Sequence, residues 1–479
     1  MRNLRNALLV GTALLSLNPI AAGAVGPATP TAPSAHEQEL EARLKLLEAA
    51  VTDLRAELNA THAQAQNTAQ IVDARAPLND KINTRVAALE VKASKPAPDG
   101  FNVGGVNVKV YGFLKTNLIF SHYDSGIVQQ NPASPTLIKD FYLPQQIPVG
   151  GGRSSTDFTA DAKQTRLGAT LGSTIGKHVI KGLVEFDFQT SQGVQASQRT
   201  TNGYNLALRR GYIQFDNLLV GQEWTNFQNV ATLPETTDFV GPTEGTVFVR
   251  QAQVRYTQPL GHGLSIAASI ENAATATVTP TSATLSENDA DKIPDVTARI
   301  NYSSKFAELS IAGLVRQLSY DNGLAGAAQL SAKGTGWGVS FAGKIPLPFG
   351  VNSDLRFMAT KGSGIGRYLG LNYAADAVQI STPNASLNTV DVFAAFAALK
   401  FGLTSKLRST VMISYQKDDY NTVVPGTVNN KAVSYAGNLF YSPVKNLDFG
   451  IEYRHGERDL LNGTQGQLDR FEFASKYNF

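Results

Sequence analysis

The residues with the clearest capacity for chemistry are basic side chains set within alternating stretches of sequence. Arg166, for example, is in phase with Gly168 and Thr170 and opposite to an apolar set. An arginine guanidinium can donate two parallel hydrogen bonds to a carboxylate, which a lysine ammonium cannot do. A polar face that carries several cations would therefore attract small anions. The sequence assigns to this face Arg166, Arg210, Arg255, Arg299, Lys181 and Lys115, and also Arg316, Arg356 and Arg454.

A second interpretation gives these basic residues a structural role. Acidic residues share the same stretches, namely Glu185, Asp187, Glu308 and Glu452. Ion pairs among them would brace a polar wall without touching any solute, and such networks are common. The sequence leaves both interpretations open. The phase of the alternation shifts at Arg209 and Arg250, so neither can be assigned to a face.

Other kinds of chemistry find no support in the sequence. The chain has no cysteine, which excludes disulfides and thiol chemistry, and its six histidines lack any metal-ligand spacing. The acidic run from Glu287 to Asp295 lacks the spacing of a calcium loop. With 42 basic and 39 acidic residues, the net charge of +3 is too balanced for a nucleic-acid binder. We therefore expect no cofactor, no metal and no enzymatic activity.

The elements that must position the basic residues follow from the hydrophobic period. The mean hydropathy is −0.14, and beyond the N-terminus no run approaches the ~20 apolar residues of a membrane helix. Behind residue 105 the period is two, which predicts strands. We predict sixteen strands, at 106–120, 157–171, 178–189, 204–216, 218–226, 246–257, 263–272, 293–303, 305–319, 334–345, 353–361, 389–402, 406–417, 431–442, 446–456 and 466–479.

The connections between these strands alternate in length. Those after even-numbered strands are short and rich in turn formers, whereas those after odd-numbered strands are mostly long and polar. Outer-membrane β-barrels show this alternation, with short turns at the periplasmic end and long loops outside. A β-sandwich or a propeller predicts no such rhythm. The predicted fold is all-β: a 16-stranded antiparallel transmembrane β-barrel over 105–479, preceded by an N-terminal α-helical coiled-coil segment.

The N-terminal region contains an export signal and a helical pattern. Arg2 and Arg5 before an apolar stretch, and small residues up to Ala24, predict a signal peptide over 1–24, followed by a linker over 25–35. Apolar residues spaced alternately four and three positions apart then predict a coiled coil over 36–92, and 93–104 is a second linker. The heptad positions are Leu40, Leu44, Leu47, Val51, Leu54 and Leu58. A lone helix that packs on the chain's own body is the alternative to self-association.

Two further features belong to the barrel. The last strand ends in aromatic residues, and Tyr477 and Phe479 resemble an outer-membrane assembly signal, with an ordinary amphipathic strand as the alternative. The third long connection, Asn226 to Thr246, is the candidate for a loop that folds inward and narrows the lumen. Its acids, Glu235, Asp238 and Glu244, would then lie opposite the basic wall, whereas a plain surface loop is the alternative.

Five segments between Asp157 and Leu260 carry a family resemblance: "DAKQTRLGA", "VEFDF", "LRRGYIQFDNLLVGQEWTNF", "LPETTDFVGP" and "RQAQVRYTQPL". In this order they resemble the DcaP-like outer-membrane porin family, and "YGFLKTNLIF" in the first strand is also similar. The resemblance implies a trimeric, 16-stranded diffusion channel with a basic constriction that favours small anionic solutes such as dicarboxylates.

Two hypotheses about function follow. The first is an outer-membrane porin for passive diffusion of small hydrophilic, preferentially anionic solutes, exported by its signal peptide and with its helix in the periplasm. Its expected partners are two further copies in a homotrimer, outer-membrane lipid and lipopolysaccharide, the barrel assembly machinery and small anionic solutes, but no nucleic acid. The second hypothesis is a structural protein that tethers the outer membrane to the cell wall through its coiled coil.

Overall fold

The computed structural model describes residues 42–46, 48–64, 100–128, 139–189, 201–287, 290–326, 329–381 and 384–479. The chain divides into two compact units, Met1–Ala97 and Pro98–Phe479. In the first unit, 42–46 and 48–64 are helical, and the heptad side chains Leu44, Val51, Leu54 and Leu58 are exposed. No helix in this described part is long and apolar enough to cross a membrane. The predicted signal peptide, both linkers up to residue 99 and the rest of the predicted coiled coil lie outside the described residues.

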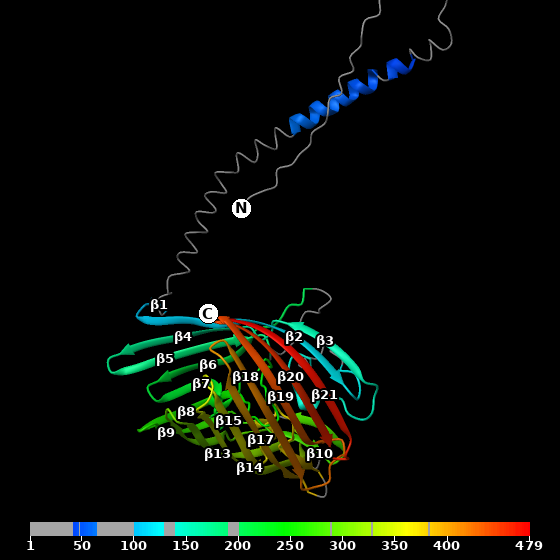
Figure 1. Ribbon diagram of the computed structural model, residues 1–479. Coiled ribbons are helices and arrows are strands. Elements are labelled where there is room, and N and C mark those ends of the chain that lie inside the picture. Colours follow the sequence, from blue (N-terminus) through cyan, green and yellow to red (C-terminus); the bar gives the residue numbers. More distant parts are fainter. Residues whose placement is uncertain are drawn as a thin grey trace, which may run out of the picture. The chain divides into compact units, whose positions relative to one another are not determined.

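The second unit is built almost entirely from strands (Figure 1). Short 3₁₀ turns also occur among the described residues, including η1 (Pro144–Gln146), η2 (Val230–Thr232) and η4 (Gly366–Tyr368). The strands are β1 (Phe101–Val103), β2 (Val106–Tyr123), β3 (Ser155–Asp161), β4 (Arg166–Ile175), β5 (His178–Asp187), β6 (Ala207–Phe215), β7 (Leu218–Trp224), β8 (Arg250–Gly261), β9 (Leu264–Glu271), β10 (Ala276–Thr279), β11 (Ser282–Glu287), β12 (Asp295–Ser303), β13 (Glu308–Asp321), β14 (Ser331–Pro346), β15 (Asp354–Ser363), β16 (Ala377–Ile380), β17 (Ser386–Gly402), β18 (Leu407–Tyr420), β19 (Asn429–Val444), β20 (Leu447–Leu460) and β21 (Gln465–Asn478).

Antiparallel pairing from strand to strand closes these elements into a barrel. β2 pairs on one side with β3 and β4, which together form one interrupted wall strand, and on the other side with β21. This last pairing, drawn in cyan and red in Figure 1, joins the two ends of the sheet. The described wall has sixteen strands, as predicted. The interruption at 162–165 was not predicted, and β10, β11 and β16 lie within the loops rather than in the wall.

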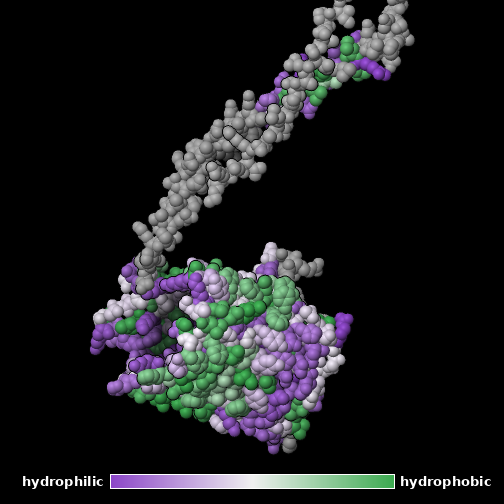
Figure 2. All heavy atoms as spheres, in the orientation of Figure 1, coloured by the Kyte–Doolittle hydropathy of each residue, from purple (hydrophilic) through white to green (hydrophobic). Residues whose placement is uncertain are grey.

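The outer face of the wall is apolar because alternate side chains point away from the lumen. Ile213, Val254, Ile300 and Val315, from four wall strands, are between 38% and 64% exposed. Figure 2 shows hydrophobic residues over much of the barrel surface that faces the viewer. Such a surface is costly in water and stable against lipid, as the alternating pattern of a transmembrane barrel requires.

Connections of two kinds leave the two ends of the barrel. One end has short turns, such as 176–177, 216–217 and 262–263, and we call it the short-turn end. The other end carries the 124–154, 188–206, 225–249, 272–294 and 364–385 loops together with three shorter ones, and we call it the long-loop end. The predicted rhythm of short and long connections is therefore present.

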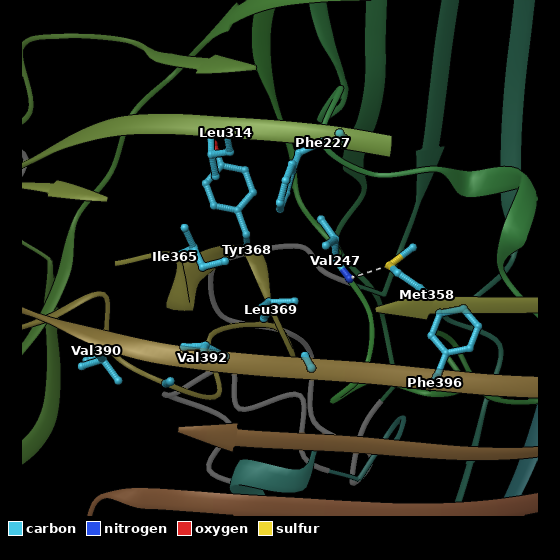
Figure 3. Close-up of a cluster of buried hydrophobic side chains, with 14 of the residues drawn as sticks. Phe227, Val247, Leu314, Met358, Ile365, Tyr368, Leu369, Val390, Val392 and Phe396 are labelled. Atoms are coloured by element: carbon cyan, nitrogen blue, oxygen red, sulfur yellow. Dashed lines mark hydrogen bonds between the residues drawn. The ribbon is translucent and has the colours of Figure 1, made fainter. Parts of the chain in front are cut away.

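Two of the long loops fold into the barrel and pair with each other. Val247 of the 225–249 loop forms an isolated antiparallel bridge with Leu369 of the 364–385 loop. Beside it, the Phe248 N–H donates to the Tyr368 carbonyl over 3.0 Å. Figure 3 shows Phe227, Val247, Ile365, Tyr368 and Leu369 packed together with wall residues, and the cluster is almost completely buried. We call this cluster the apolar plug.

The apolar plug explains why some inward positions of the wall are apolar. Leu314 of β13 and Val392 and Phe396 of β17 point inward, yet they are apolar and at most 3% exposed. They are apolar because the two loops cover them. On β14 the wall makes room for the loops with glycine: a Cβ at Gly338 would lie 3.0 Å from Ile365 and 3.1 Å from Phe227.

This contact predicts the effect of adding a side chain at Gly338. A Gly338→Val substitution forces the loops away from β14, and overpacking of this kind costs about 1–3 kcal/mol. Gly313→Val on β13 is the matched control, because a Cβ there meets no atom within 4 Å. We expect thermal unfolding of the barrel at a clearly lower midpoint for Gly338→Val alone. Equal midpoints for the two variants would show that the loops do not depend on this wall contact.

Candidate functional site

A β-bulge brings two consecutive arginines to the inside of the barrel. Glu185 pairs with Arg210 and Phe186 with Leu208, so Arg209 is the extra residue. The Arg209 Nε donates to Glu185 over 3.0 Å, and its Nη1 contacts Asp187. Arg210 donates two hydrogen bonds to Glu223, of 2.7 and 2.6 Å. The ambiguous phase at Arg209 is thus explained: both arginines point inward.

Arg166 lies in the same cluster. Its guanidinium is 3.9 Å from carboxylate oxygens of both Glu185 and Asp187, and it stacks 5.0 Å from the centre of the Phe113 ring. Arg166, Arg209 and Arg210 therefore share a small set of acids. At these positions the structure has the ion pairs that the structural interpretation requires, which reduces the net field that the three cations can exert.

Arg255 and Arg299 differ from this cluster. Both lie on inward positions, in β8 and β12, and within the described residues no carboxylate oxygen lies within 4 Å of either guanidinium. Arg299 donates through Nη1 to the Gln228 carbonyl. Its Nε is buried and has no hydrogen-bond partner among the residues that the structure describes. The Arg255 Nη1 lies 3.5 Å from the Trp224 carbonyl. The nearby acid Glu271 accepts hydrogen bonds from Asn226, Ser269 and Gln251 instead.

The two predicted lysines occupy different surroundings. Lys181 is exposed close to the short-turn end, in register with Gly172 and Gln214 and on the face of Glu185. Lys115 is only 7% exposed, and its ammonium donates to Gln164 and to the Thr237 carbonyl, at 2.6 and 2.5 Å. Lys115 is thus a loop contact as well as an inward cation. It anchors the 225–249 loop to β2.

The loop that carries the predicted acids lies inside the barrel. Glu235 forms a bidentate ion pair with Arg408 of β18, with distances from 2.6 to 2.9 Å, and lies 3.3 Å from Lys400 of β17. Thr236 and the Thr237 N–H both donate to Glu452 of β20. Contacts with three wall strands therefore hold the tip of the loop in place.

Asp238 and Glu244, the other two predicted acids of this loop, make contacts that stabilise the loop itself. Asp238 accepts hydrogen bonds from the backbone N–H groups of Tyr142, Val240 and Gly241, at 2.7 to 3.1 Å. Glu244 is fully buried, and burial raises the pKa of its carboxyl group. A desolvated carboxyl is disfavoured in its charged form, so Glu244 adds little to any field.

A polar cavity of about 250 Å³ lies between the wall and the tip of this loop. Its lining includes Arg166 and Lys476 from the wall and Glu235 from the loop, and Lys115 and Asp238 border it. The structure therefore brings charges of opposite sign from wall and loop to one cavity.

The contacts that hold the second inward loop could not be predicted from the sequence. Arg316 of β13, which the alternation did place inward, is completely buried; it lies 3.3 Å from Asp295 and 3.0 Å from Asp376 of the 364–385 loop. Tyr368 donates to Asp295 over 2.7 Å. The roles of Arg408 and Lys400 were missed as well. The available signal was the row of small inward residues on β14, Gly334, Gly336, Gly338, Ser340 and Ala342, which leaves space that a loop must fill.

At the C-terminus, Phe479 exchanges backbone hydrogen bonds of 3.1 and 3.2 Å with Gly112 of β2. The side chains of Tyr477 and Phe479 are about half exposed, at 49% and 48%. Both aromatics thus lie at the seam where the barrel closes.

A closed barrel of sixteen antiparallel strands, with an apolar outer face, a charged inner face and a loop folded inside, defines the class of outer-membrane porin channels. The family model for the DcaP outer membrane protein matches residues 145–479, and the chain belongs to this family. The family and the fold are those of channels, not enzymes. No curated protein sequence matches the chain.

The chain is also similar to solved structures, of which the first below shows the same fold. The crystal structure of the outer membrane channel DcaP of Acinetobacter baumannii is similar with a TM-score of 0.64 and 24% identity, over 80% of this chain and 100% of that one. In vitro folded OmpT of Vibrio cholerae gives a TM-score of 0.49 and 12% identity, over 80% and 100%. OmpF of Salmonella typhi in complex with daunomycin gives 0.46 and 12%, over 78% and 98%.

The Glu235 ion pair predicts how the tip of the inward loop responds to acid. Burial alone would raise the pKa of the Glu235 carboxyl group, but the hydrogen bond from Arg408 and the charges of Lys400 and Arg408 lower it overall. A lowered folded-state pKa stabilises the fold above the unfolded value of about 4.3 and ceases to do so as the pH falls through the folded value. The tip should therefore stay attached at pH 5 and loosen only in stronger acid.

A spin label tests this response cleanly, because the chain has no native cysteine. With the label at a Pro234→Cys substitution, we expect low mobility from pH 7 down to about pH 4.5 and a rise below it. With Glu235→Gln added, the label should be mobile at every pH. An acid step of the same size in the Glu235→Gln variant would assign the response to another group.

Proposed function

We propose that the chain forms a water-filled channel for passive diffusion of small hydrophilic solutes, preferentially anions of the dicarboxylate type. The observation that carries the proposal is the pair Arg255 and Arg299, two inward guanidinium groups with no carboxylate within 4 Å among the described residues. A partly buried charge without a counter-ion is unfavourable. A passing anion can therefore form the ion pair that no carboxylate of the protein forms with these guanidinium groups.

The spacing of the two arginines suits a solute with two charges. β9 separates their strands: Arg255 is in register with Ser269 of β9 and Arg299 with Ala267. Neighbouring strands lie about 4.8 Å apart, so the two backbones are about 10 Å apart across the wall. A short dicarboxylate can therefore contact one guanidinium with each of its carboxylates, and each guanidinium can donate hydrogen bonds to the carboxylate that it contacts.

The other predicted residues contribute to this function in a graded way. Arg166 and Arg210 line the same side of the lumen, but their acids offset much of their charge. Lys181 adds an exposed cation at the short-turn end, which we assign to the periplasmic side. Glu235 and its loop form the constriction, held against Arg408. Permeant anions would thus meet a basic wall opposite a loop whose acid is already neutralised.

Removal of both uncompensated arginines should reduce the preference for anions. Two unit charges about 8 Å apart interact by about 2 kcal/mol at an effective dielectric constant of 20, so the preference should fall several-fold. The measurement is the reversal potential of Arg255→Gln/Arg299→Gln channels in a planar bilayer under a KCl gradient. The matched control is Lys177→Gln/Lys305→Gln, which removes two exposed cations from turns at the short-turn end of the barrel.

An unchanged reversal potential in the arginine variant would make Arg255 and Arg299 structural. An equal loss in the lysine control would assign selectivity to net charge rather than to position. Absence of any conductance in the unmodified chain would favour the tether to the cell wall instead.

The partners we propose follow from the surfaces. The apolar outer face fits outer-membrane lipid and lipopolysaccharide, and the exposed aromatics Tyr477 and Phe479 at the seam fit recognition by the barrel assembly machinery. The exposed heptad leucines fit a periplasmic coiled coil in a homotrimer. Such apolar side chains gain stability only when another helix covers them.

Deletion of residues 36–92 tests the role of the helix in assembly. We expect the trimer to dissociate at a lower temperature or lower detergent concentration than the full chain, measured by light scattering. A full chain with Leu44, Val51, Leu54 and Leu58 changed to Asn keeps the length and should behave like the deletion. Trimers of unchanged stability in both variants would show that wall contacts alone hold the subunits together.

A further inference from the structure

A second cavity, of about 170 Å³, lies at the long-loop end and is separate from the basic wall. The η1 turn, the β10–β11 hairpin, the 364–385 loop and the 421–428 loop converge on it, together with the ends of β18, β19 and β20. Four connections and three strands therefore form the walls of this cavity.

The lining of this cavity carries a single formal charge. Arg458 of β20 is its one ionised residue, and the lining includes no acid. The Arg458 Nε donates to Asn429 over 2.9 Å, and Nη1 donates to the Ile147 carbonyl over 2.8 Å. Among the described residues, Nη2 makes no hydrogen bond and no carboxylate lies within 4 Å of the guanidinium. The guanidinium is thus held in place with donor capacity left over.

One side of the cavity is apolar. Tyr373 and Val278 are at most 2% exposed, and Val428 is 3% exposed. The Tyr373 hydroxyl donates to the Lys431 carbonyl over 2.7 Å, which fixes its ring. Tyr420 and Leu285 complete the apolar side. An engineered apolar cavity of about 150 Å³ binds benzene, so this volume suits one small ring or a branched aliphatic group.

The 364–385 loop shows backbone strain where it borders the cavity. Three consecutive residues have positive φ angles: Gly370 at 56°, Leu371 at 54° and Asn372 at 70°. Residues with side chains rarely adopt this conformation, and such strain concentrates at ligand sites. The Asn372 Oδ1 and the Gln145 Oε1 are buried and have no hydrogen-bond partner within the described residues. Both residues line the cavity, which therefore has polar groups beside its apolar side chains.

We propose that this cavity binds a small carboxylate with a compact apolar body, of the size and chemistry of benzoate. Arg458 takes the carboxylate through its remaining donors, and the two tyrosines and the aliphatic side chains enclose the apolar part. Such a subsite at the long-loop end goes beyond diffusion, because it is saturable and prefers an apolar carboxylate over other anions of equal charge.

The test is isothermal titration of the full-length protein in detergent, with benzoate as the probe. We expect one binding site per chain, weakened about tenfold or more by Arg458→Gln, which removes a charge-assisted hydrogen bond. Ala283→Leu fills the cavity from β11 and leaves Arg458 intact, so it should also abolish binding. Thr284→Leu is the matched control, because the adjacent Thr284 is exposed and does not line the cavity.

Two comparisons separate this site from the channel itself. Arg255→Gln/Arg299→Gln should bind benzoate as the unmodified chain does, even if its ion preference is lost. Benzyl alcohol, which has similar size and no charge, should bind much more weakly. Absence of benzoate binding, binding that survives both Arg458→Gln and Ala283→Leu, or equal binding of benzyl alcohol would each overturn the proposal and leave the channel function untouched.

Discussion

The pairing of two loops inside the barrel is the interaction on which the rest of the structure depends. A wall of sixteen strands encloses more space than its own side chains can fill, so the interior is defined by what folds into it. The bridge between Val247 and Leu369 joins the 225–249 and 364–385 loops into one body. This body covers the inward faces of β13, β14 and β17 and leaves the lumen to the strands on the basic side.

The charged side chains differ between the part of the wall that the loops cover and the basic side of the lumen. Two of the cations that hold the loops against the wall are paired with acids: Arg316 has Asp295 and Asp376, and Arg408 has Glu235. A buried ion pair contributes little to net stability, but the loss of one partner is costly, so these pairs fix the position of the loops more than they stabilise the barrel. Arg255 and Arg299 have no such acid within 4 Å among the described residues, and this is the basis of the proposed function.

Much of the fold could be predicted because strands in lipid obey one strict pattern. An outward face must be apolar, so the period of two recurs through every wall strand, and all sixteen were located to within a few residues. Inward loops obey no such period. Glu235, Asp238 and Glu244 were predicted as one group of acids, yet they have three different roles: an ion pair, a backbone cap and a buried carboxyl group. Those roles depend on contacts with residues far away in the chain, such as Arg408 and Tyr142, which no local pattern encodes.

The central claim is that uncompensated arginines make the lumen prefer anions. The most direct measurement is the reversal potential of the unmodified chain in a planar bilayer under a KCl gradient, repeated with the potassium salt of a short dicarboxylate. The account predicts a potential of the sign set by chloride, and a conductance that the dicarboxylate lowers as it occupies the arginine pair. A potential of the sign set by potassium, or a conductance indifferent to the dicarboxylate, would contradict it.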